Sequence, residues 1–161
     1  MKFDFNRRKI EFHRNRRKIE FHKYRQTTNM EQTFFLIKPH VSNEDCDKII
    51  DRLNSEGFLI EDSRVKVFPV DHWKLHYQEH HGRDFFEDLC SSMADQEVMY
   101  FILSSEDSTV VKLRKLLGAT DPSKAEVGTL RNEFGESVRK NAAHASDSLE
   151  SAQREIKLWF G

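Results

Sequence analysis

The sequence predicts an α+β sandwich in which helices pack on a four-stranded antiparallel sheet, the split β-α-β plan of ferredoxin-like domains. Short apolar, β-prone runs alternate along the chain with segments whose apolar residues repeat at helical spacing. The order is β-α-β-α-α-β-α-loop-α, and one more short strand after His144 would complete the sheet, with the helices on one face. The 161 residues suit one domain with a sizeable core. Because this fold hosts many functions, it does not by itself define an activity.

The first strand is predicted over residues 32–38, where an apolar, β-prone run ends at a proline. Ser42 is placed to cap the helix that follows, and Gly57 is placed to end it. The apolar positions that repeat at helical spacing between them are Cys46, Ile49, Ile50 and Leu53. Alternation of apolar and polar residues then predicts a long strand from Phe58 to Phe68.

The second half of the domain alternates in the same way. The predicted elements are a helix capped by Asp71 and running toward His80, a helix over 85–93, a buried strand over 98–103, a helix over 105–117 stopped by Gly118, and a long loop over 119–134. Short helices are expected to flank His144, and an apolar run over residues 156–160 closes the chain.

The chain divides into two segments of different charge. Residues 1–29 hold ten Lys or Arg and three acidic residues, a balance of +7, so the −1 of the whole chain leaves −8 for residues 30–161. Within the basic segment, the octapeptide 6–13 recurs unchanged as residues 15–22. We interpret residues 1–29 as a repeat-containing N-terminal extension that is disordered or non-native, rather than as an arm for nucleic acid or an anionic surface. Met30 begins the predicted domain.

Composition excludes several classes of protein. No apolar run approaches the length of a membrane span, so no membrane partner is expected. Cys46 and Cys90 form no pairing motif, which is typical of a reducing compartment, and we expect a cytoplasmic protein. The basic segment lacks the apolar core of a secretory signal, and its acidic residues weigh against an organelle transit peptide.

A phosphate site in this chain has to be built from side chains. The sequence contains neither G-x-x-x-x-G-K-[ST] nor G-x-G-x-x-G, and its six glycines are not clustered. The candidate phosphate ligands are Lys38 at a strand end, Arg114 late in a helix, Thr120 just past a glycine and Arg131 in the long loop. Singly each is typical of a solvated surface, so they matter only if the fold brings them to His144.

The segment 141–148, Asn-Ala-Ala-His-Ala-Ser-Asp-Ser, is the most informative in the chain. Small neighbours leave the imidazole of His144 uncrowded, and the residues from Ser146 to Ser148 can cap a following helix. Glu155 lies far enough along that helix to return toward the ring and accept a hydrogen bond from it. A histidine held by a carboxylate, with its other nitrogen free, is typical of a nucleophile or a proton shuttle.

These motifs, at this spacing, resemble the nucleoside diphosphate kinase family over residues 30–161. The matching segments are Leu36–Pro39, Arg83 with Phe85 and Phe86, Gly118–Pro122, Gly128–Arg131, Asn141–Ser148 and Ser151–Ile156. The resemblance implies a ferredoxin-like fold and transfer of the γ-phosphoryl group from a nucleoside triphosphate to a nucleoside diphosphate, by a ping-pong mechanism through a phosphohistidine. It implies Mg²⁺ held chiefly by nucleotide phosphates, no nucleic-acid partner, and a homo-oligomer, tetramer or hexamer, built from dimers.

The resemblance also implies roles for individual residues at the reacting centre. By the family's pattern, His144 would carry the phosphoryl group, with Glu155 and Ser146 orienting its ring. Tyr77 would lie beside the reacting phosphoryl group. Lys38 would help to hold the ribose hydroxyl and the transferring phosphate.

Further residues would form the nucleotide site by the same pattern. Those at its ribose and phosphate end would be Lys38, Asn141, Arg114, Thr120 and Arg131. At its other end Phe85 would stack on the base, with Leu89 and Val138 nearby. Stacking without readout of the base edges suits an enzyme that is indifferent to base identity.

The chain departs from the family's pattern at several positions. His40 stands where the family usually has Asp, and Ala145 stands where it usually has Gly after the histidine. Residues 95–97 replace a Ser-Gly-Pro turn. If position 145 needed a left-handed backbone, alanine there would cost roughly 1–2 kcal/mol.

Two other functions remain open from the sequence. His72, His76 and His80 recur at helical spacing, with His81 next to them, and such a stripe could bind Zn²⁺ or Ni²⁺. We favour a solvated helix face, because helical spacing alone places three rings in line rather than around an ion. The domain could instead be a non-catalytic module that binds nucleotide or RNA. The residues that phosphoryl transfer requires, and the absence of an aromatic RNA-binding strand, favour the enzyme.

Overall fold

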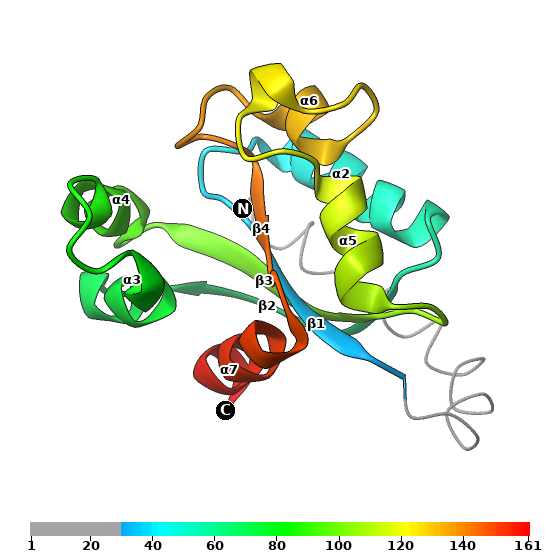
Figure 1. Ribbon diagram of the computed structural model, residues 1–161, viewed down its shortest axis with the longest axis horizontal. Coiled ribbons are helices and arrows are strands. Elements are labelled where there is room, and N and C mark those ends of the chain that lie inside the picture. The colour runs from blue at the N-terminus through cyan, green and yellow to red at the C-terminus, as the bar shows by residue number, and fades with distance from the viewer. Residues whose placement is uncertain (1–29) are drawn as a thin grey trace.

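The computed structural model describes residues 30–161, so the basic repeat segment and its interpretation lie outside the described residues. Within this part of the chain, strands form one antiparallel sheet in the order β2-β3-β1-β4 (Figure 1). Their bounds are β1 Gln32–Ile37, β2 Leu59–Val67, β3 Glu97–Ser104 and β4 Ala143–Ala145. The α+β, ferredoxin-like prediction is therefore confirmed.

The last strand contains His144 rather than following it, which corrects the predicted order. β4 pairs with β1, and His144 lies opposite Leu36 in the register. Ala143 and Ala145 on either side of His144 are fully buried against the core.

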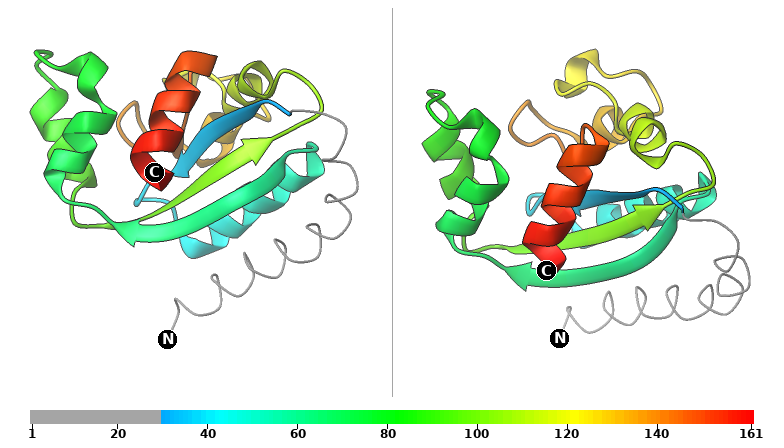
Figure 2. Two further views of the ribbon diagram at one scale, coloured as in Figure 1. Left: turned by 90° about the horizontal axis from the view of Figure 1, so that it is seen from below. Right: turned by 60° about the horizontal axis from the view of Figure 1, so that its bottom comes forward.

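Helices cover both faces of the sheet, so the expectation of helices on one face is wrong. On one side lie α2 (Asn43–Ser55) and α5 (Thr109–Leu117), and on the other lie α3 (Val70–His76), α4 (Phe86–Met93) and α7 (Leu149–Phe160) (Figures 1 and 2). The reason lies in β1, whose side chains are buried on both of its faces. A strand buried on both sides needs an apolar layer on each.

The helix ends follow capping chemistry in part. Ser42 caps α2 and accepts a hydrogen bond from the backbone N–H of Asp45 at 3.2 Å, as predicted. Asp71, in contrast, does not cap α3, which starts at Val70 directly after Pro69. This helix ends at His76, and Gln78–His80 forms a separate 3₁₀ turn, so the single helix predicted toward His80 is two elements.

Two further bounds differ from the prediction. α5 begins at Thr109 rather than at residue 105, because the carboxylate of Glu31 accepts a hydrogen bond from the N–H of Val110 at 2.8 Å and so caps the helix there. The loop predicted over residues 119–134 contains a 3₁₀ turn, Pro122–Lys124, and α6, Leu130–Phe134. Both elements are too short to show helical periodicity in the sequence.

No helix within residues 30–161 is long and apolar enough to cross a bilayer. Cys46 and Cys90 are both free and buried.

Candidate active site

A pocket of about 520 Å³ opens where the end of β1, β4 and α7 meet α3, α4 and the loops around residues 120 and 140. It collects eleven of the twelve site residues expected from the sequence, all except Ser146. They are Lys38, Tyr77, Phe85, Leu89, Arg114, Thr120, Arg131, Val138, Asn141, His144 and Glu155. Residues that are far apart along the chain therefore share one cavity.

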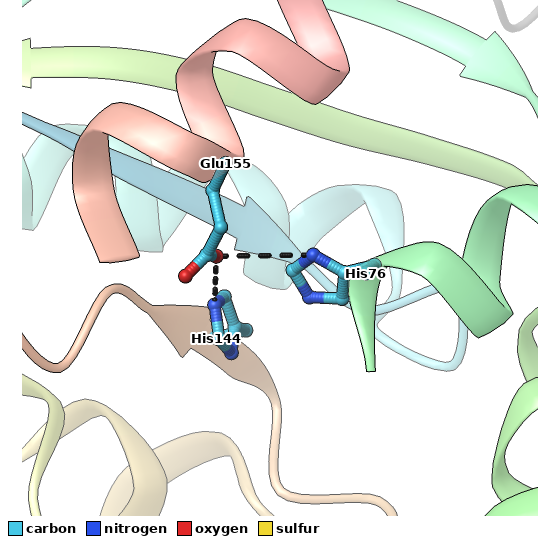
Figure 3. Close-up of side chains that lie close together, drawn as sticks. All are labelled: His76, His144 and Glu155. Atoms are coloured by element: carbon cyan, nitrogen blue, oxygen red, sulfur yellow. Dashed lines mark hydrogen bonds and ion pairs between the residues drawn. The ribbon is translucent and has the colours of Figure 1, made fainter. Parts of the chain in front are cut away.

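His144 and Glu155 form the centre of this pocket. The hydroxyl of Ser148 caps α7, which directs that helix back over the sheet so that Glu155 reaches the strand. His144 Nε2 lies 2.5 Å from Glu155 Oε2, close enough for the ring N–H to donate to the carboxylate (Figure 3). Glu155 is buried, whereas the His144 side chain is 24% exposed. Among residues 30–161, Nδ1 of His144 has no hydrogen-bond partner, so this nitrogen is free to react.

A second histidine lies beside the same carboxylate. His76 is buried, its Nδ1 lies 3.8 Å from Glu155 Oε2, and the two imidazole rings are 4.6 Å apart (Figure 3). The indole N–H of Trp159 donates to His76 Nδ1 at 3.1 Å. Burial holds the pKa of His76 well below its usual range, so the ring is neutral and carries its proton on Nε2.

The histidine stripe predicted as a metal site does not form one. His72 stacks on Phe68 at 4.0 Å, and α3 ends before His80. Within the described chain, the residues whose ligand atoms gather are His76, His144 and Glu155. Glu155 accepts from His144, and His76 Nδ1 accepts from Trp159, whereas Nε2 of His76 is buried without a hydrogen-bond partner within the described residues.

Three basic side chains of the pocket, those of Lys38, Arg114 and Arg131, contact carbonyl groups rather than carboxylates. Lys38 donates to the carbonyl of Arg139 at 3.0 Å, and Arg131 donates to those of Gly118 and Ala143 at 3.2 and 3.1 Å. Arg114 lies 3.4 Å from the carbonyl of Ala145. Within residues 30–161, Lys38, Arg114 and Arg131 form no ion pair with a carboxylate. Buried cations are normally paired, so this cluster is suited to an anionic ligand.

Burial lowers the pKa of two of these cations. It lowers the pKa of Lys38 to about 8, with the charges of Arg131 and Arg139 adding to the shift. It also lowers the pKa of Arg131 to about 10, with Arg114 contributing. A bound phosphate would reverse both shifts, because an opposite charge favours the protonated form.

Four polar side chains of the pocket have buried atoms without partners in the described chain. They are Nε2 of His76, the hydroxyl of Tyr77, Nε of Arg131 and Oδ1 of Asn141, whose amide nitrogen donates to the carbonyl of Thr120 at 3.0 Å. Burial raises the pKa of Tyr77, so its hydroxyl keeps its proton. Buried polar groups are nearly always hydrogen-bonded, so unpaired ones in a pocket mark positions that a ligand would fill.

The opposite side of the pocket is apolar. Phe85 precedes α4 and is 43% exposed, and Leu89 and Val138 line the cavity with it. An exposed aromatic ring at the edge of a cationic cavity suits a flat, apolar ligand face.

The sequence matches the family described as "Nucleoside diphosphate kinase" over residues 31–161. The chain belongs to this family. Nucleoside diphosphate kinases of Staphylococcus epidermidis and Staphylococcus aureus are each 38% identical to it over 132 residues, covering 81% of this chain and 88% of theirs.

Solved nucleoside diphosphate kinases have the same fold. The Aquifex aeolicus enzyme superimposes with a TM-score of 0.77 at 33% identity, covering 82% of this chain and 96% of its own. The Encephalitozoon cuniculi enzyme gives 0.78 at 34% identity, covering 82% and 90%. The chain is accordingly an enzyme, a phosphotransferase that acts as a nucleoside diphosphate kinase.

Ser146 is the one predicted site residue that does not line this kinase's pocket. It is fully buried, and its hydroxyl has no hydrogen-bond partner within residues 30–161. Its backbone N–H donates to the carbonyl of Phe34 at 3.2 Å, which extends the pairing of β4 with β1. Within residues 30–161 no hydrogen bond joins Ser146 to His144, whereas Glu155 contacts Nε2 of the ring.

Backbone strain lies at Ala142, not at Ala145. Ala142 has φ of 73°, while Ala145 is an ordinary strand residue paired with Phe35. The N–H of Ala143 donates to the carbonyl of Asn141 at 2.9 Å, which closes a γ-turn centred on Ala142. Holding a non-glycine residue in this conformation costs of order 1–3 kcal/mol, and such strain is typical of active sites.

Gly118 ends α5 and directs the chain into the loop that carries Thr120. Its φ is 86°, and a Cβ there would lie 2.5 Å from the hydroxyl oxygen of Thr129. Both the backbone angle and the close approach require glycine at this position.

Other pocket residues of this nucleoside diphosphate kinase were not predicted from the sequence. Arg154 donates to Glu79 at 2.9 Å, and Asp147 accepts from the hydroxyl of Ser151 at 2.7 Å, which helps to hold its pKa below the usual range. The remaining ones are His76, His80, Arg139 and Ala145. Arg154 could have been found from the sequence, because it directly precedes Glu155 on α7. Arg139 could not, because it lies in a loop without periodicity.

Proposed function

We propose that this nucleoside diphosphate kinase transfers the γ-phosphoryl group by a ping-pong reaction through a phosphohistidine at His144. The observation that carries the proposal is the free Nδ1 of His144, whose ring is held by Glu155 inside a cavity where Lys38, Arg114 and Arg131 lack carboxylate partners within residues 30–161. A neutral imidazole is a good nucleophile near pH 7, and its phosphorylated form is reactive enough to return the group.

In the first half-reaction, Nδ1 of His144 attacks the γ-phosphorus of the nucleoside triphosphate. The N–P bond forms as the bond from the γ-phosphorus to the bridging oxygen breaks, and the diphosphate leaves with that electron pair. In the second, a terminal oxygen of an incoming diphosphate attacks the phosphorus and the N–P bond breaks. Glu155 accepts the Nε2–H bond throughout, which keeps the tautomer that exposes Nδ1 and stabilises the positive charge that develops on the ring.

Phosphoryl transfer depends mainly on positioning and on charge stabilisation. Lys38, Arg114 and Arg131 supply positive charge, and Thr120 and the unpaired hydroxyl of Tyr77 supply hydrogen bonds. Their local charge has to outweigh the −8 of residues 30–161, which repels nucleotides at long range.

Asn141 and Lys38 would hold the ribose hydroxyl and the transferring phosphate, and Phe85 would stack on the base between Leu89 and Val138. A stacking face does not read base edges, which supports the use of several nucleosides. We therefore propose nucleoside di- and triphosphates of more than one base as substrates.

Mg²⁺ fits this pocket as a companion of the nucleotide. Glu155 is engaged with His144 and Glu79 with Arg154, so phosphate oxygens and water would supply most ligands, with Asp147 as the exposed carboxylate nearby. Bound there, the ion would neutralise charge on the β- and γ-phosphates.

We further propose that the chain works in the cytoplasm as a homo-oligomer built from dimers. The free thiols of Cys46 and Cys90 suit a reducing compartment. Large apolar side chains on the outside of the domain suit subunit contacts. They include Val67, Leu75, Val111, Val127 and Leu149. Light scattering of the purified protein would distinguish a monomer from a tetramer or a hexamer.

The test uses ATP labelled on its γ-phosphate. The protein should acquire an acid-labile label, and unlabelled nucleoside diphosphates of any base should remove it within a turnover. His144→Ala should abolish labelling while nucleotide binding stays nearly unchanged. Normal labelling of that variant would show that another residue is the nucleophile, and binding without any labelling of the wild-type protein would favour a non-catalytic nucleotide-binding module.

A further inference from the structure

His40 lies outside the pocket but holds the strained turn that precedes His144. It follows Pro39 in a β-turn at the end of β1, closed by the N–H of Val41 donating to the carbonyl of Lys38 at 3.1 Å. From this turn, Nε2 of His40 accepts a hydrogen bond from the backbone N–H of Ala142 at 3.1 Å. The two segments are 102 residues apart in the sequence.

Both backbone groups of Ala142 are bonded to this turn. Its N–H donates to His40, and its carbonyl accepts from the N–H of Lys38 at 2.8 Å. Ala142 is fully buried, so water cannot replace either partner, and a lost bond would leave a buried polar group unpaired. The strained φ of 73° therefore depends on this pair of contacts.

The strained turn controls the positions of two pocket residues. Asn141 directly precedes Ala142, and its carbonyl accepts the bond that closes the turn. His144 follows two residues after Ala142, as the middle residue of β4. A relaxed turn would shift Asn141 and the entry into β4, and with them the direction of the His144 ring relative to Lys38.

The bond from Ala142 requires a particular protonation state of His40. Nε2 can accept only when it carries no proton, so the neutral ring must hold its proton on Nδ1. Protonation of Nε2 would place two N–H groups against each other at 3.1 Å and convert an attraction into a repulsion.

The groups that face His40 have opposing effects on this equilibrium. Burial lowers the pKa of His40, and Lys38 and Lys140 lower it further, whereas Glu136 raises it. The Glu136 carboxylate lies 3.8 Å from Nδ1 and is 62% exposed, so solvent weakens its effect. His40 is consequently neutral near pH 7 and available to titrate in acid.

We propose that His40 is a positioning residue for phosphoryl transfer: its neutral ring holds Ala142 in the strained turn, and its protonation releases that turn and misplaces His144. The inference rests on the proposed role of His144. It gives this enzyme an additional loss of activity in acid, one that originates outside the reacting ring. An acceptor that does not titrate at this position would remove the additional loss.

The test compares pH profiles of two glutamine variants. In His40→Gln the side-chain oxygen reaches about as far as Nε2 and accepts at every pH. His81→Gln, at an exposed histidine outside the pocket, is the matched control. The single-turnover rate of His144 labelling by γ-labelled ATP is measured from pH 5 to pH 8, with circular dichroism to confirm the fold at each pH.

For each unit by which the pH falls in acid, we expect the rate of the wild-type protein and of His81→Gln to decrease by up to about tenfold more than the rate of His40→Gln. The reason is the one additional proton that His40 takes up. His40→Ala should be slow even at pH 8, and His40→Gln should restore most of the rate. Superimposable profiles of the wild-type protein and His40→Gln would overturn the inference.

A spectroscopic measurement on the wild-type protein needs no variant that might misfold. Nitrogen-15 NMR at pH 8 should show His40 with its proton on Nδ1 and an unprotonated Nε2, and the amide of Ala142 should be protected from exchange. A proton on Nε2 would contradict the inference. Failure of His144 to take label at any pH would instead contradict the proposed mechanism and leave the NMR result standing.

Discussion

Lys38 illustrates how a single buried group connects the fold to ligand binding. It is 7% exposed at the end of β1, and burial together with two arginines holds its pKa at about 8. In the free enzyme the Lys38 ammonium therefore loses its proton at a lower pH than an ordinary lysine does. A bound phosphate would raise the pKa of Lys38 again.

We predict that this residue makes ADP binding sensitive to alkaline pH. Below about pH 8 Lys38 is charged both with and without ligand, so it adds no pH dependence. Above that pH the free enzyme loses the proton while the complex retains it, so affinity falls as pH rises, by up to about tenfold per unit. Calorimetry from pH 7 to pH 9 measures the decline and the proton taken up on binding.

Lys38→Gln provides the comparison for that prediction. It should bind ADP more weakly at pH 7 and show little change up to pH 9. A wild-type affinity that stays constant across this range would show that Lys38 does not contact the phosphates.

Phe85 supports a separate prediction at the base end of the pocket. Phe85→Ala should weaken nucleotide binding by roughly 1–3 kcal/mol, because the stacking surface for the base is lost. The loss should be similar for purine and pyrimidine diphosphates, as measured by calorimetry. An effect confined to one base would indicate readout of base edges instead.

At the scale of elements, α7 is the support of the site. It carries Glu155 to the ring of His144 and Trp159 to His76, and its first turn is held by the hydroxyl of Ser148. α7 thus contacts the imidazoles of both His76 and His144. The position at which the helix starts determines where Glu155 lies.

Removing that cap should destabilise the domain. Ser148→Ala should lower the free energy of unfolding by about 0.5–2 kcal/mol, the usual value of an N-cap side chain. Urea denaturation measures the change. Ser55→Ala, at the exposed end of α2, is the matched control and should change stability by less than about 0.5 kcal/mol. Equal losses of unfolding free energy in the two variants would show that the Ser148 hydroxyl stabilises the domain no more than the exposed Ser55 hydroxyl does.

Several elements were predictable because their signals are local. β1 and β3 are apolar runs bounded by turn residues, and α2 has apolar periodicity with a serine cap. The start of α5 was not predictable, since its capping carboxylate comes from Glu31, 79 residues away. β4 was missed as the strand of His144 because three residues are too few for alternation to be recognised.

At the scale of the whole molecule, the charge difference divides the chain at residue 30. The described domain contains the pocket lined by the predicted site residues and both apolar clusters. We therefore expect a protein that begins at Met30 to retain the fold and the transfer activity of the full chain. Comparison of their melting temperatures and labelling rates is the measurement, and a large loss on removing residues 1–29 would assign those residues a role in folding or assembly.

The sequence by itself determined the chemical groups of the site and the family, because those depend on residue types at characteristic spacings. β1, β2 and β3 and the caps of α2 and α7 were accessible for the same reason. Only the tertiary structure decided that Lys38, Arg114 and Arg131 share one cavity without carboxylate partners within residues 30–161. Only it showed that His40 holds Ala142 and that Trp159 supports His76. These contacts join residues separated by 80 or more positions, and no local pattern can encode the geometry in which distant segments pack.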